Sequence, residues 1–325
     1  MDLDVVFVGT SGSMPTAQRA PTATLVRRGG ERILFDCAEG TQRQLLRSDV
    51  GLVELREVFL THFHADHFLG LPGMLKTFAL RGRELPLTIY GPRGLSELMG
   101  SLRRIFGKLT YPYELIELEP GDVLERDGYR LIPFAAHHGN LALGFALLED
   151  ERPGRFDVAT ADALGVPSGP ERGALQRGEP VTLANGTLVT AEQVLGSARP
   201  GRRLVLSGDT APTPSVAAAA VGADVLVHEA TFCEDEADRA RETEHSTAAD
   251  AARIALEAGV KLLALTHLSS RYSAGDVERE ARTIFPDTVV PRDFDVIEIP
   301  FPERGLPALV KSGARLPRSV PAPVV

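Results

Sequence analysis

The segment from residue 62 to residue 67 carries four side chains of the kinds that bind metal ions. They are His62, His64, Asp66 and His67. The apolar run EVFL at 57–60 precedes them and predicts a β-strand that ends where the ligands begin. Imidazole nitrogens and carboxylate oxygens are ligands of Zn²⁺ in hydrolytic sites, and a turn lets them converge. A mononuclear catalytic zinc ion usually takes three protein ligands, so four in one turn favour two ions roughly 3.5–4 Å apart.

Further candidate ligands follow, or end, other predicted strands. They are His138, Asp209, His228 and His267. A dinuclear site is assembled from loops at one edge of a scaffold, so we expect these side chains to meet the first four there. All eight histidines of the chain lie at such positions or beside them. Unrelated histidines would be scattered, so the pattern predicts one His/Asp metal centre.

The elements that must position these ligands are short strands and helices separated by Gly and Pro. Runs rich in aliphatic and aromatic residues predict strands at 3–8, 22–27, 32–36, 57–61, 87–90, 129–135, 204–207, 224–228, 261–266 and 295–299. Helical spacing predicts helices at 40–48, 69–80, 94–106, 213–221 and 247–258. For the last of these, Ser246 is the expected N-cap and Gly259 the C-terminal stop.

Two segments break this regularity. Between about 149 and 203, Gly, Pro and Arg are frequent and long apolar runs are few, which predicts an insertion. After residue 301 the chain becomes rich in proline, which predicts a C-terminal tail.

The composition is that of an ordinary globular chain. Its 325 residues are 43% hydrophobic, enough for a large buried core. The formal charge of −9 argues against general adhesion to nucleic acid but allows a local basic patch. No window approaches the roughly 20 apolar residues of a membrane span, and the acidic start does not resemble a signal peptide, so we expect a cytoplasmic protein with no membrane partner. Two cysteines are too few for a disulfide framework or a Cys-rich zinc site.

The motifs as a set resemble the metallo-β-lactamase superfamily and, within it, the ribonuclease Z family of tRNA 3′-processing endonucleases. The superfamily motif HxHxDH is present at 62–67. Family-level matches extend over nearly the whole chain: FDCAEGTQRQL at 35–45, GLPGML at 70–75, IYGPRGL at 89–95, HGNLALGF at 138–145, SGDT at 207–210, HEAT at 228–231, HST at 245–247 and THLSSRY at 266–272. Two mild departures, Ala38 for Gly and Phe145 for Tyr, do not touch the proposed chemistry.

The resemblance implies an α/β fold, the αββα four-layer sandwich with the metals at one edge of the paired sheets and a protruding tRNA-binding arm. One hydrolase domain would then span 1–302, with a flexible arm inserted at about 149–203 and a Pro-rich tail at 303–325. It also implies a homodimer in which one subunit's arm serves precursor tRNA held at the other's site.

The resemblance assigns ligands to two zinc ions per subunit. One ion would be held by His62, His64 and His138, the other by Asp66, His67 and His267, with Asp209 bridging. It prefers His138 to the neighbouring His137. Mn²⁺ or another divalent ion suits the same ligand types. Two such ions lower the pKa of water to about 7, which suits hydrolysis of a phosphodiester.

Acid–base roles follow from the same resemblance. Asp66 would also orient or deprotonate the attacking water. The leaving 3′ oxygen of the tRNA needs a proton, and His245 is the candidate donor, with Glu229 holding its imidazole protonated and oriented. A plain buried ion pair for Glu229 and simple phosphate binding for His245 are the alternatives. Thr231 is assigned to packing.

The insertion is similar to the arm by which such enzymes grip the tRNA elbow. Its Gly-Pro turn corresponds to Gly169 and Pro170. The arginines that could meet phosphates there are Arg152, Arg155, Arg172 and Arg177.

Two other functions compete with this one. HxHxDH alone leaves the substrate open, so another phosphodiesterase of this fold or an arylsulfatase-like hydrolase is the first alternative. A tRNA-binding protein without catalysis is the second. The insertion, HEAT and HST favour removal of the 3′ trailer from precursor tRNA, leaving a 3′-hydroxyl on the tRNA.

Overall fold

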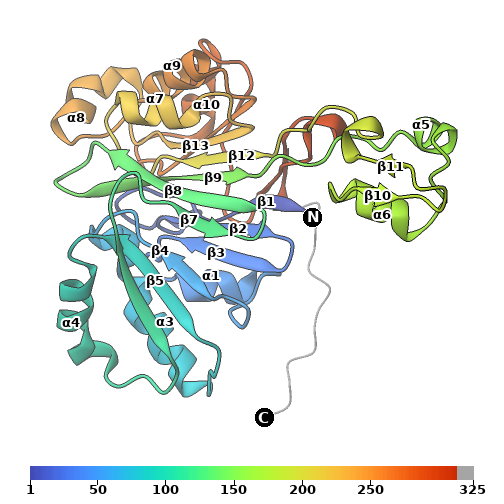
Figure 1. Ribbon diagram of the computed structural model, residues 1–325. Coiled ribbons are helices and arrows are strands. Elements are labelled where there is room, and N and C mark those ends of the chain that lie inside the picture. The colour runs from blue at the N-terminus through green and yellow to red at the C-terminus, as the bar shows by residue number, and fades with distance from the viewer. Residues whose placement is uncertain (313–325) are drawn as a thin grey trace.

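The computed structural model describes residues 1–312, which form two β-sheets packed face to face (Figure 1). In spatial order, the first sheet contains β17 (Ala308–Val310), β16 (Val296–Glu298), β1 (Leu3–Gly9), β2 (Ala23–Arg28), β3 (Glu31–Phe35), β4 (Glu57–Phe59), β5 (Leu87–Pro92) and β6 (Tyr113–Leu118). The second contains β15 (Thr288–Val289), β14 (Leu262–Thr266), β13 (Val225–Glu229), β12 (Arg203–Leu206), β9 (Ala142–Glu149), β8 (Tyr129–Ala136) and β7 (Leu124–Arg126). Both sheets mix parallel and antiparallel pairs.

Helices cover the outer face of each sheet. Below the first sheet in Figure 1 lie α1 (Thr41–Arg47), α3 (Gly70–Leu80) and α4 (Leu95–Phe106). Above the second lie α7 (Pro214–Ala220), α8 (Ala237–Glu242), α9 (Ala248–Ala258) and α10 (Ala274–Arg282). The predicted arrangement of two sheets with outer helices is therefore present.

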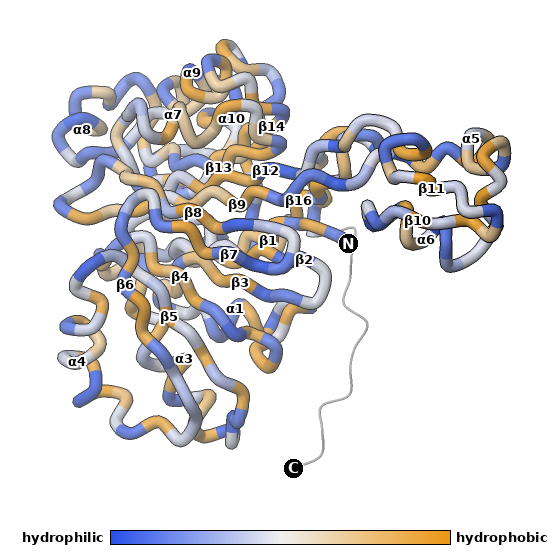
Figure 2. The backbone as a smooth tube through the Cα atoms, viewed as in Figure 1, coloured by the Kyte–Doolittle hydropathy of each residue, from blue (hydrophilic) through white to orange (hydrophobic). Residues whose placement is uncertain are grey.

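Strand periodicity explains these layers. Successive side chains of a strand point to opposite faces. In β1, Val5 and Phe7 join the core between the sheets, whereas Val6 and Val8 join the core under α1 and α3. A third core packs the second sheet against α7, α9 and α10. Figure 2 shows hydrophobic residues concentrated along the strands in the middle of the molecule.

The parallel strands bring the candidate ligands to one edge. β12, β13 and β14 are parallel neighbours, so their carboxyl ends lie side by side. Asp209, Glu229 and His267 lie at or just beyond these ends. In the facing sheet, β4 runs parallel to β3 and β5 and leads into His62.

The predicted strands and helices are all present, with bounds correct to within two residues. The predicted stop at Gly259 is confirmed, since this glycine ends α9 with φ 62° in the left-handed region. The predicted N-cap was wrong by one residue. Thr247 caps α9 through a capping box with Asp250, while the Ser246 hydroxyl donates to the Thr210 carbonyl oxygen.

The first part of the predicted tail belongs to the fold. Residues 302–304 form a 3₁₀ turn, and β17 pairs antiparallel with β16. The prolines along this segment led to the prediction of a tail. An edge strand tolerates nearby proline, because one side of it makes no hydrogen bonds to another strand. Residues 313–325, the rest of the predicted tail, lie outside the described residues.

The predicted insertion is a protruding lobe between β9 and β12 (Figure 1). It contains α5 (Val158–Ala163), α6 (Pro170–Gln176), β10 (Val181–Thr182) and β11 (Leu188–Val189). Its own small core consists of Ala161, Val166, Leu175, Leu183, Val189 and Val194. We call residues 150–202 the arm.

A buried ion-pair network lies where the arm leaves the body. Glu149, at the end of β9, accepts hydrogen bonds from Arg202 Nε and Nη2, both at 2.7 Å, and from Arg28 Nε at 3.0 Å. Arg202 is only 1% exposed. Because Arg28 belongs to β2, the network links the two sheets as well as the base of the arm.

Among residues 1–312, no helix combines the length and the apolar character needed to cross a membrane.

Replacing Glu149 by Gln should make the free energy of unfolding less dependent on pH in the acid range. Burial raises the pKa of Glu149, but the hydrogen bonds and charge of Arg202 outweigh burial and lower it below its ordinary value. The ion pair therefore stabilises the fold above the unfolded-state pKa of about 4.3, and this contribution is lost as pH falls through the lower folded-state pKa. Because the variant leaves Arg202 buried without a counter-charge, we expect it to be about 3 kcal/mol less stable at pH 7.

Thermal unfolding at pH 7 and pH 3 tests this expectation. The deficit of Glu149→Gln should shrink at the lower pH, and Glu257→Gln, on the exposed face of α9, should match the parent at both. An equal deficit at both pH values would contradict the ion-pair explanation.

Candidate metal centre

Five histidines and two aspartates converge at the edge where the strands end. They are His62, His64, Asp66, His67, His138, Asp209 and His267. The one-turn helix α2 (Ala65–Phe68) follows β4 and presents Asp66 and His67 from successive positions. His62 and His64 lie in the loop between β4 and α2, and His138, Asp209 and His267 lie in the loops after β8, β12 and β14. The seven ligands that the family resemblance assigns are thus brought to this cluster. His228, the further candidate from the strand pattern, belongs to none of the metal-ligand groups found within residues 1–312: it is buried, with its Nδ1 2.8 Å from the Glu229 carbonyl oxygen.

One half of the cluster contains three imidazoles. A nitrogen of His62, of His64 and of His138 all lie within 4.8 Å of one another. His138 Nε2 is 3.0 Å from His64 Nδ1. The neighbouring His137 has a side chain 63% exposed, near Glu244, and belongs to none of the metal-ligand groups found within residues 1–312.

The other half contains Asp66, His67 and His267. His267 Nε2 lies 3.3 Å from Asp66 Oδ2, and His67 Nε2 lies 3.7 Å from the same oxygen. Asp209 stands between the two halves: its Oδ2 is 3.1 Å from His67 Nε2, 3.2 Å from His267 Nε2 and 4.0 Å from His62 Nε2.

Each of four rings points one nitrogen into the cluster and holds the other on a fixed partner. His67 Nδ1 lies 2.8 Å from Asp36 Oδ2, and His138 Nδ1 lies 2.9 Å from the Glu244 carbonyl oxygen. His267 Nδ1 lies 2.8 Å from the Thr231 hydroxyl, and His62 Nδ1 lies 3.0 Å from the Thr61 hydroxyl. Such outer contacts fix the tautomer of metal-binding histidines.

Two observations, on the rings of His62 and His67, indicate that the nitrogen and oxygen atoms of the cluster suit bound cations. Burial lowers the pKa of His62 well below its ordinary value, so its ring is neutral. Its Nε2 is buried and has no hydrogen-bond partner within residues 1–312, a free lone pair aimed into the cluster. Although burial lowers the pKa of His67, the flanking carboxylates of Asp209 and Asp36 raise it well above its ordinary value, so the site favours positive charge at this position.

A hydrogen-bonded pair lies beside the cluster. His245 Nδ1 is 2.7 Å from Glu229 Oε1, and the buried Glu229 also accepts bonds from the Thr210 amide, the Thr231 amide and the Thr231 hydroxyl. Burial alone would lower the pKa of His245, but the Glu229 carboxylate raises it to about 9. The imidazole is therefore a cation at neutral pH, and the two predicted acid–base partners are in contact.

Sequence reasoning missed three contributors to the site. Thr231 was assigned to packing, which was wrong, because its hydroxyl contacts both Glu229 and His267. Asp36 directly follows β3, within the motif FDCAEG. Its carboxylate lies 2.8 Å from His67 Nδ1 and accepts a hydrogen bond from the Thr61 hydroxyl. The Ser13 amide donates to Asp66 Oδ2 at 2.8 Å. Asp36 lies within a family motif, so the sequence did carry a signal for it. Ser13 acts through its backbone amide, which every residue except proline has, so its residue type could not indicate the contact.

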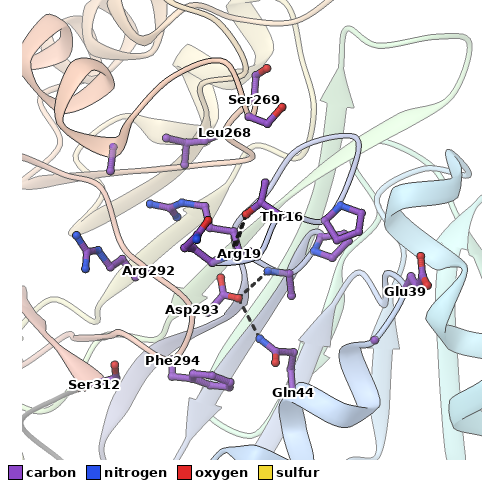
Figure 3. Close-up of a pocket in the computed structure, with 18 of the residues that line it drawn as sticks. Thr16, Arg19, Glu39, Gln44, Leu268, Ser269, Arg292, Asp293, Phe294 and Ser312 are labelled. Atoms are coloured by element: carbon purple, nitrogen blue, oxygen red, sulfur yellow. Dashed lines mark hydrogen bonds between the residues drawn. The ribbon is translucent and has the colours of Figure 1, made fainter.

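The loop between β1 and β2, which carries Ser13, is also held by Asp293, and Figure 3 shows the hydrogen bond from Gln44 to this carboxylate. Asp293 accepts bonds from the Thr10 hydroxyl, the Ala20 amide and the Gln44 side-chain amide. The same region forms a groove of about 970 Å³. Its arginines are Arg19, Arg43, Arg47 and Arg292, and Leu268 and Ser269, which directly follow His267, also line it.

The arm residues predicted to bind phosphate lie away from the cluster, and three of the arginines already have carboxylate partners. Arg152 pairs with Glu303, Arg172 with Asp162, and Arg177 with Glu179. Arg155 is exposed and has no side-chain partner in the described part of the chain. Gly169 and Pro170 form the start of α6, with Gly169 at φ 143°.

Comparison with known proteins identifies the family. The family described as the metallo-β-lactamase superfamily matches residues 17–174. Ribonuclease Z of Methanosarcina acetivorans is 46% identical over 304 residues, covering 92% of this chain and 99% of the relative. Ribonuclease Z of Myxococcus xanthus is 50% identical over 271 residues, covering 83% and 88%.

Solved structures agree with the fold. The short form of human tRNase Z superposes with a TM-score of 0.66 at 26% identity, covering 91% of this chain and 99% of that one. The metallo-β-lactamase fold protein YhfI from Bacillus subtilis superposes with a TM-score of 0.68 at 21% identity, covering 92% and 100%. With relatives this similar over almost its whole described length, the chain belongs to the ribonuclease Z family of the metallo-β-lactamase superfamily.

Proposed function

We propose that this chain is an endonuclease that removes the 3′ trailer from precursor tRNA by metal-dependent hydrolysis of one phosphodiester. The observation that carries the proposal is the complete His/Asp cluster beside the His245–Glu229 pair, in a chain 46% identical to ribonuclease Z over 92% of its length. The arginines of the groove next to His267 suit a polyanionic substrate.

We assign the cluster to two divalent cations, zinc being the expected ion. The first would be held by His62, His64 and His138, the second by Asp66, His67 and His267, and Asp209 would serve both. When bound, the cations supply Lewis-acid chemistry that favours deprotonation of water near neutral pH and neutralises charge on the phosphate. The free lone pair of His62 Nε2 and the outer contacts of the other rings support this assignment.

The chain's own residues would move the protons. Asp66, held by the Ser13 amide, would orient the attacking water or take its proton. The new bond joins the water oxygen to phosphorus, and the bond from phosphorus to the 3′ oxygen of the tRNA breaks. His245 holds Glu229 through Nδ1, so its Nε2 can give a proton to that leaving oxygen. The products are a tRNA with a 3′-hydroxyl and a trailer with a 5′-phosphate.

We assign the arm to binding of the tRNA body, and we propose a homodimer in which one subunit's arm serves the other's site. The arm is not a strongly basic element, since Arg152, Arg172 and Arg177 are paired with carboxylates. Its own buried core, and Arg155, which is exposed and without a side-chain partner in residues 1–312, support recognition of shape with few ionic contacts.

Cleavage of a labelled precursor tests the function directly. We expect metal-loaded protein to cut a 5′-labelled precursor tRNA just after the discriminator nucleotide. A chelator should abolish the product because it removes the cations. Asp66→Ala should abolish it because the substitution removes a carboxylate that would hold one cation and act on the attacking water. The control Asp238→Ala changes a carboxylate that is 92% exposed on α8 and should cleave normally. Folded, metal-loaded protein that spares precursor tRNA but hydrolyses small phosphodiesters or sulfate esters would support the alternative hydrolase.

His245→Ala should slow only reactions whose leaving group needs a proton. For precursor tRNA we expect kcat to fall by about 10²–10⁴. Thymidine 5′-(4-nitrophenyl) phosphate, whose leaving group departs as a stable anion, should react almost as fast as with the parent. Metal content should stay unchanged, and His137→Ala, at the exposed neighbour of the cluster, should behave as the parent. Equal loss on both substrates would refute the proton-donor role.

Removing the arm should separate binding from chemistry. Phe156 and Leu195 pair across the two strands of the arm's base, so an Asn-Gly turn can replace residues 157–194. We expect kcat/KM for precursor tRNA to fall about a hundredfold or more, because a second contact with the same substrate is lost. Hydrolysis of the nitrophenyl ester should survive, and its equal loss would count against a separate binding arm.

A further inference from the structure

The arm is joined to the body by a narrow two-stranded stalk, residues 149–157 and 194–202. Five backbone hydrogen bonds of 2.7–2.9 Å cross it, from the pair Glu149–Arg202 to the pair Asp157–Val194. Gly154 lies so close to the opposite strand that a Cβ there would be 1.9 Å from the Gly196 carbonyl oxygen. A two-stranded ribbon alone is marginally stable in water, so it is a weak support for a lobe held away from the body.

A third segment of chain supports the stalk. It runs from Ile299 to Leu306, between β16 and β17, and is therefore fixed to the first sheet at both ends. Figure 1 shows this red segment lying against the base of the arm. Two of its side chains, Phe301 and Glu303, contact the stalk, and we call this pair the C-terminal clamp.

Phe301 packs against both strands of the stalk. The guanidinium carbon of Arg152, on the outgoing strand, lies 3.6 Å from the centroid of the ring. That of Arg202, on the returning strand, lies 4.1 Å from it. Cation–π contacts at these distances are attractive, and they strengthen where solvent is excluded.

Glu303 joins the same two strands by ionic hydrogen bonds. Its Oε1 accepts from Arg152 Nη1 at 2.8 Å and from Arg199 Nη1 at 3.0 Å, and its Oε2 accepts from Arg152 Nη2 at 2.9 Å. The hydrogen bonds from Arg152 lower the pKa of Glu303 to about 2, so the carboxylate is charged at neutral pH. The bidentate geometry fixes direction as well as distance.

The stalk is also tied to the body beneath the clamp. Arg202 donates to the Ile299 carbonyl oxygen at 2.9 Å and to the Met1 carbonyl oxygen at 3.1 Å, besides its bonds to Glu149. The base of the stalk is thus held by Glu149 and its upper part by the clamp. Among the side-chain contacts found in residues 1–312, those of the clamp are the ones that hold the strands beyond Arg202 against bending.

We propose that Phe301 and Glu303 are positioning residues that hold the arm at a fixed orientation and thereby set the affinity for precursor tRNA. The inference rests on the proposed function in one respect, that the arm binds the tRNA body. Neither residue would touch the substrate or the reacting phosphate. Their effect is preorganisation: a substrate that must reach both the arm and the metal centre binds more tightly when the two are already in register.

The test compares paired variants at each position. Phe301→Leu removes the aromatic face, while its control Phe301→Tyr keeps it. Glu303→Gln removes the charge, while its control Glu257→Gln removes a charge from the exposed face of α9. For Phe301→Leu and Glu303→Gln, we expect KM for precursor tRNA to rise about tenfold with kcat nearly unchanged, because only the orientation cost of binding changes. Hydrolysis of the nitrophenyl ester should be unaffected in all four.

A distance measurement between two spin labels tests the orientation of the arm in the absence of substrate. Spin labels at Asn185→Cys, in the arm's hairpin turn, and Glu97→Cys, on α4, report the spread of arm orientations when the labelled chain is diluted with unlabelled chain, so that each dimer carries one labelled subunit. The native Cys37 and Cys233 are buried and should not be labelled. We expect a narrow distribution in the parent and in both controls, and a broad one in Phe301→Leu and Glu303→Gln.

The outcomes separate this inference from the proposed function. Folded Phe301→Leu and Glu303→Gln with parental KM and a narrow distribution would overturn it. A broadened distribution without a change in KM would also overturn it, because the orientation would not govern affinity. If the parent itself failed to cleave precursor tRNA, the proposed function would fall, and the spin-label distances would still decide whether the clamp fixes the arm. If Phe301→Leu fails to fold, Glu303→Gln carries both measurements alone.

Discussion

Everything in this molecule depends on keeping seven side chains, five imidazoles and two carboxylates, crowded together at one edge of two sheets. Lone pairs and negative charges at such distances repel one another unless cations lie between them, so the protein has to fix each group from outside. It does so with buried hydrogen-bond partners such as Asp36 and Thr231, and with a backbone conformation of positive φ that few non-glycine residues adopt. Of the five non-glycine residues with positive φ in residues 1–312, Ser13, Asp36, Glu244 and His267 all belong to or touch the cluster. Strained backbone of this kind persists only where the surroundings over-determine it.

The proposed function divides the work between body and arm, with the chemistry in the body and tRNA binding in the arm. The cluster and the His245–Glu229 pair sit on rigid strand ends, where small displacements are resisted by the cores on both sides of each sheet. The arm has a separate core, and within residues 1–312 its hydrogen bonds to the body all come from the stalk. Glu149 connects the two parts, since it ends β9, bonds to Arg28 of the opposite sheet and anchors Arg202.

Much of this could be predicted from the sequence, for identifiable reasons. Ligands such as His62 and Asp209 follow apolar runs whose β character is strong, and parallel strands deliver their ends to one edge. Family motifs then chose His138 over His137, a choice that residue type alone could not make. What escaped prediction depends on long-range contacts. Glu303 gives no local signal that it meets Arg152, 151 residues away, and the Ser13 contact to Asp66 uses only its backbone amide. Spaced prolines likewise hid the short strand β17.

The position of the arm in the topology has a consequence for how such enzymes can vary. β9 and β12 are antiparallel neighbours, so the chain leaves the sheet and returns to it within one strand spacing. Any lobe, long or short, can occupy that gap without moving a strand that carries a ligand. The size and shape of this lobe and the geometry of the His/Asp cluster are therefore independent variables of one fold, and related chains can change the first while leaving the second untouched.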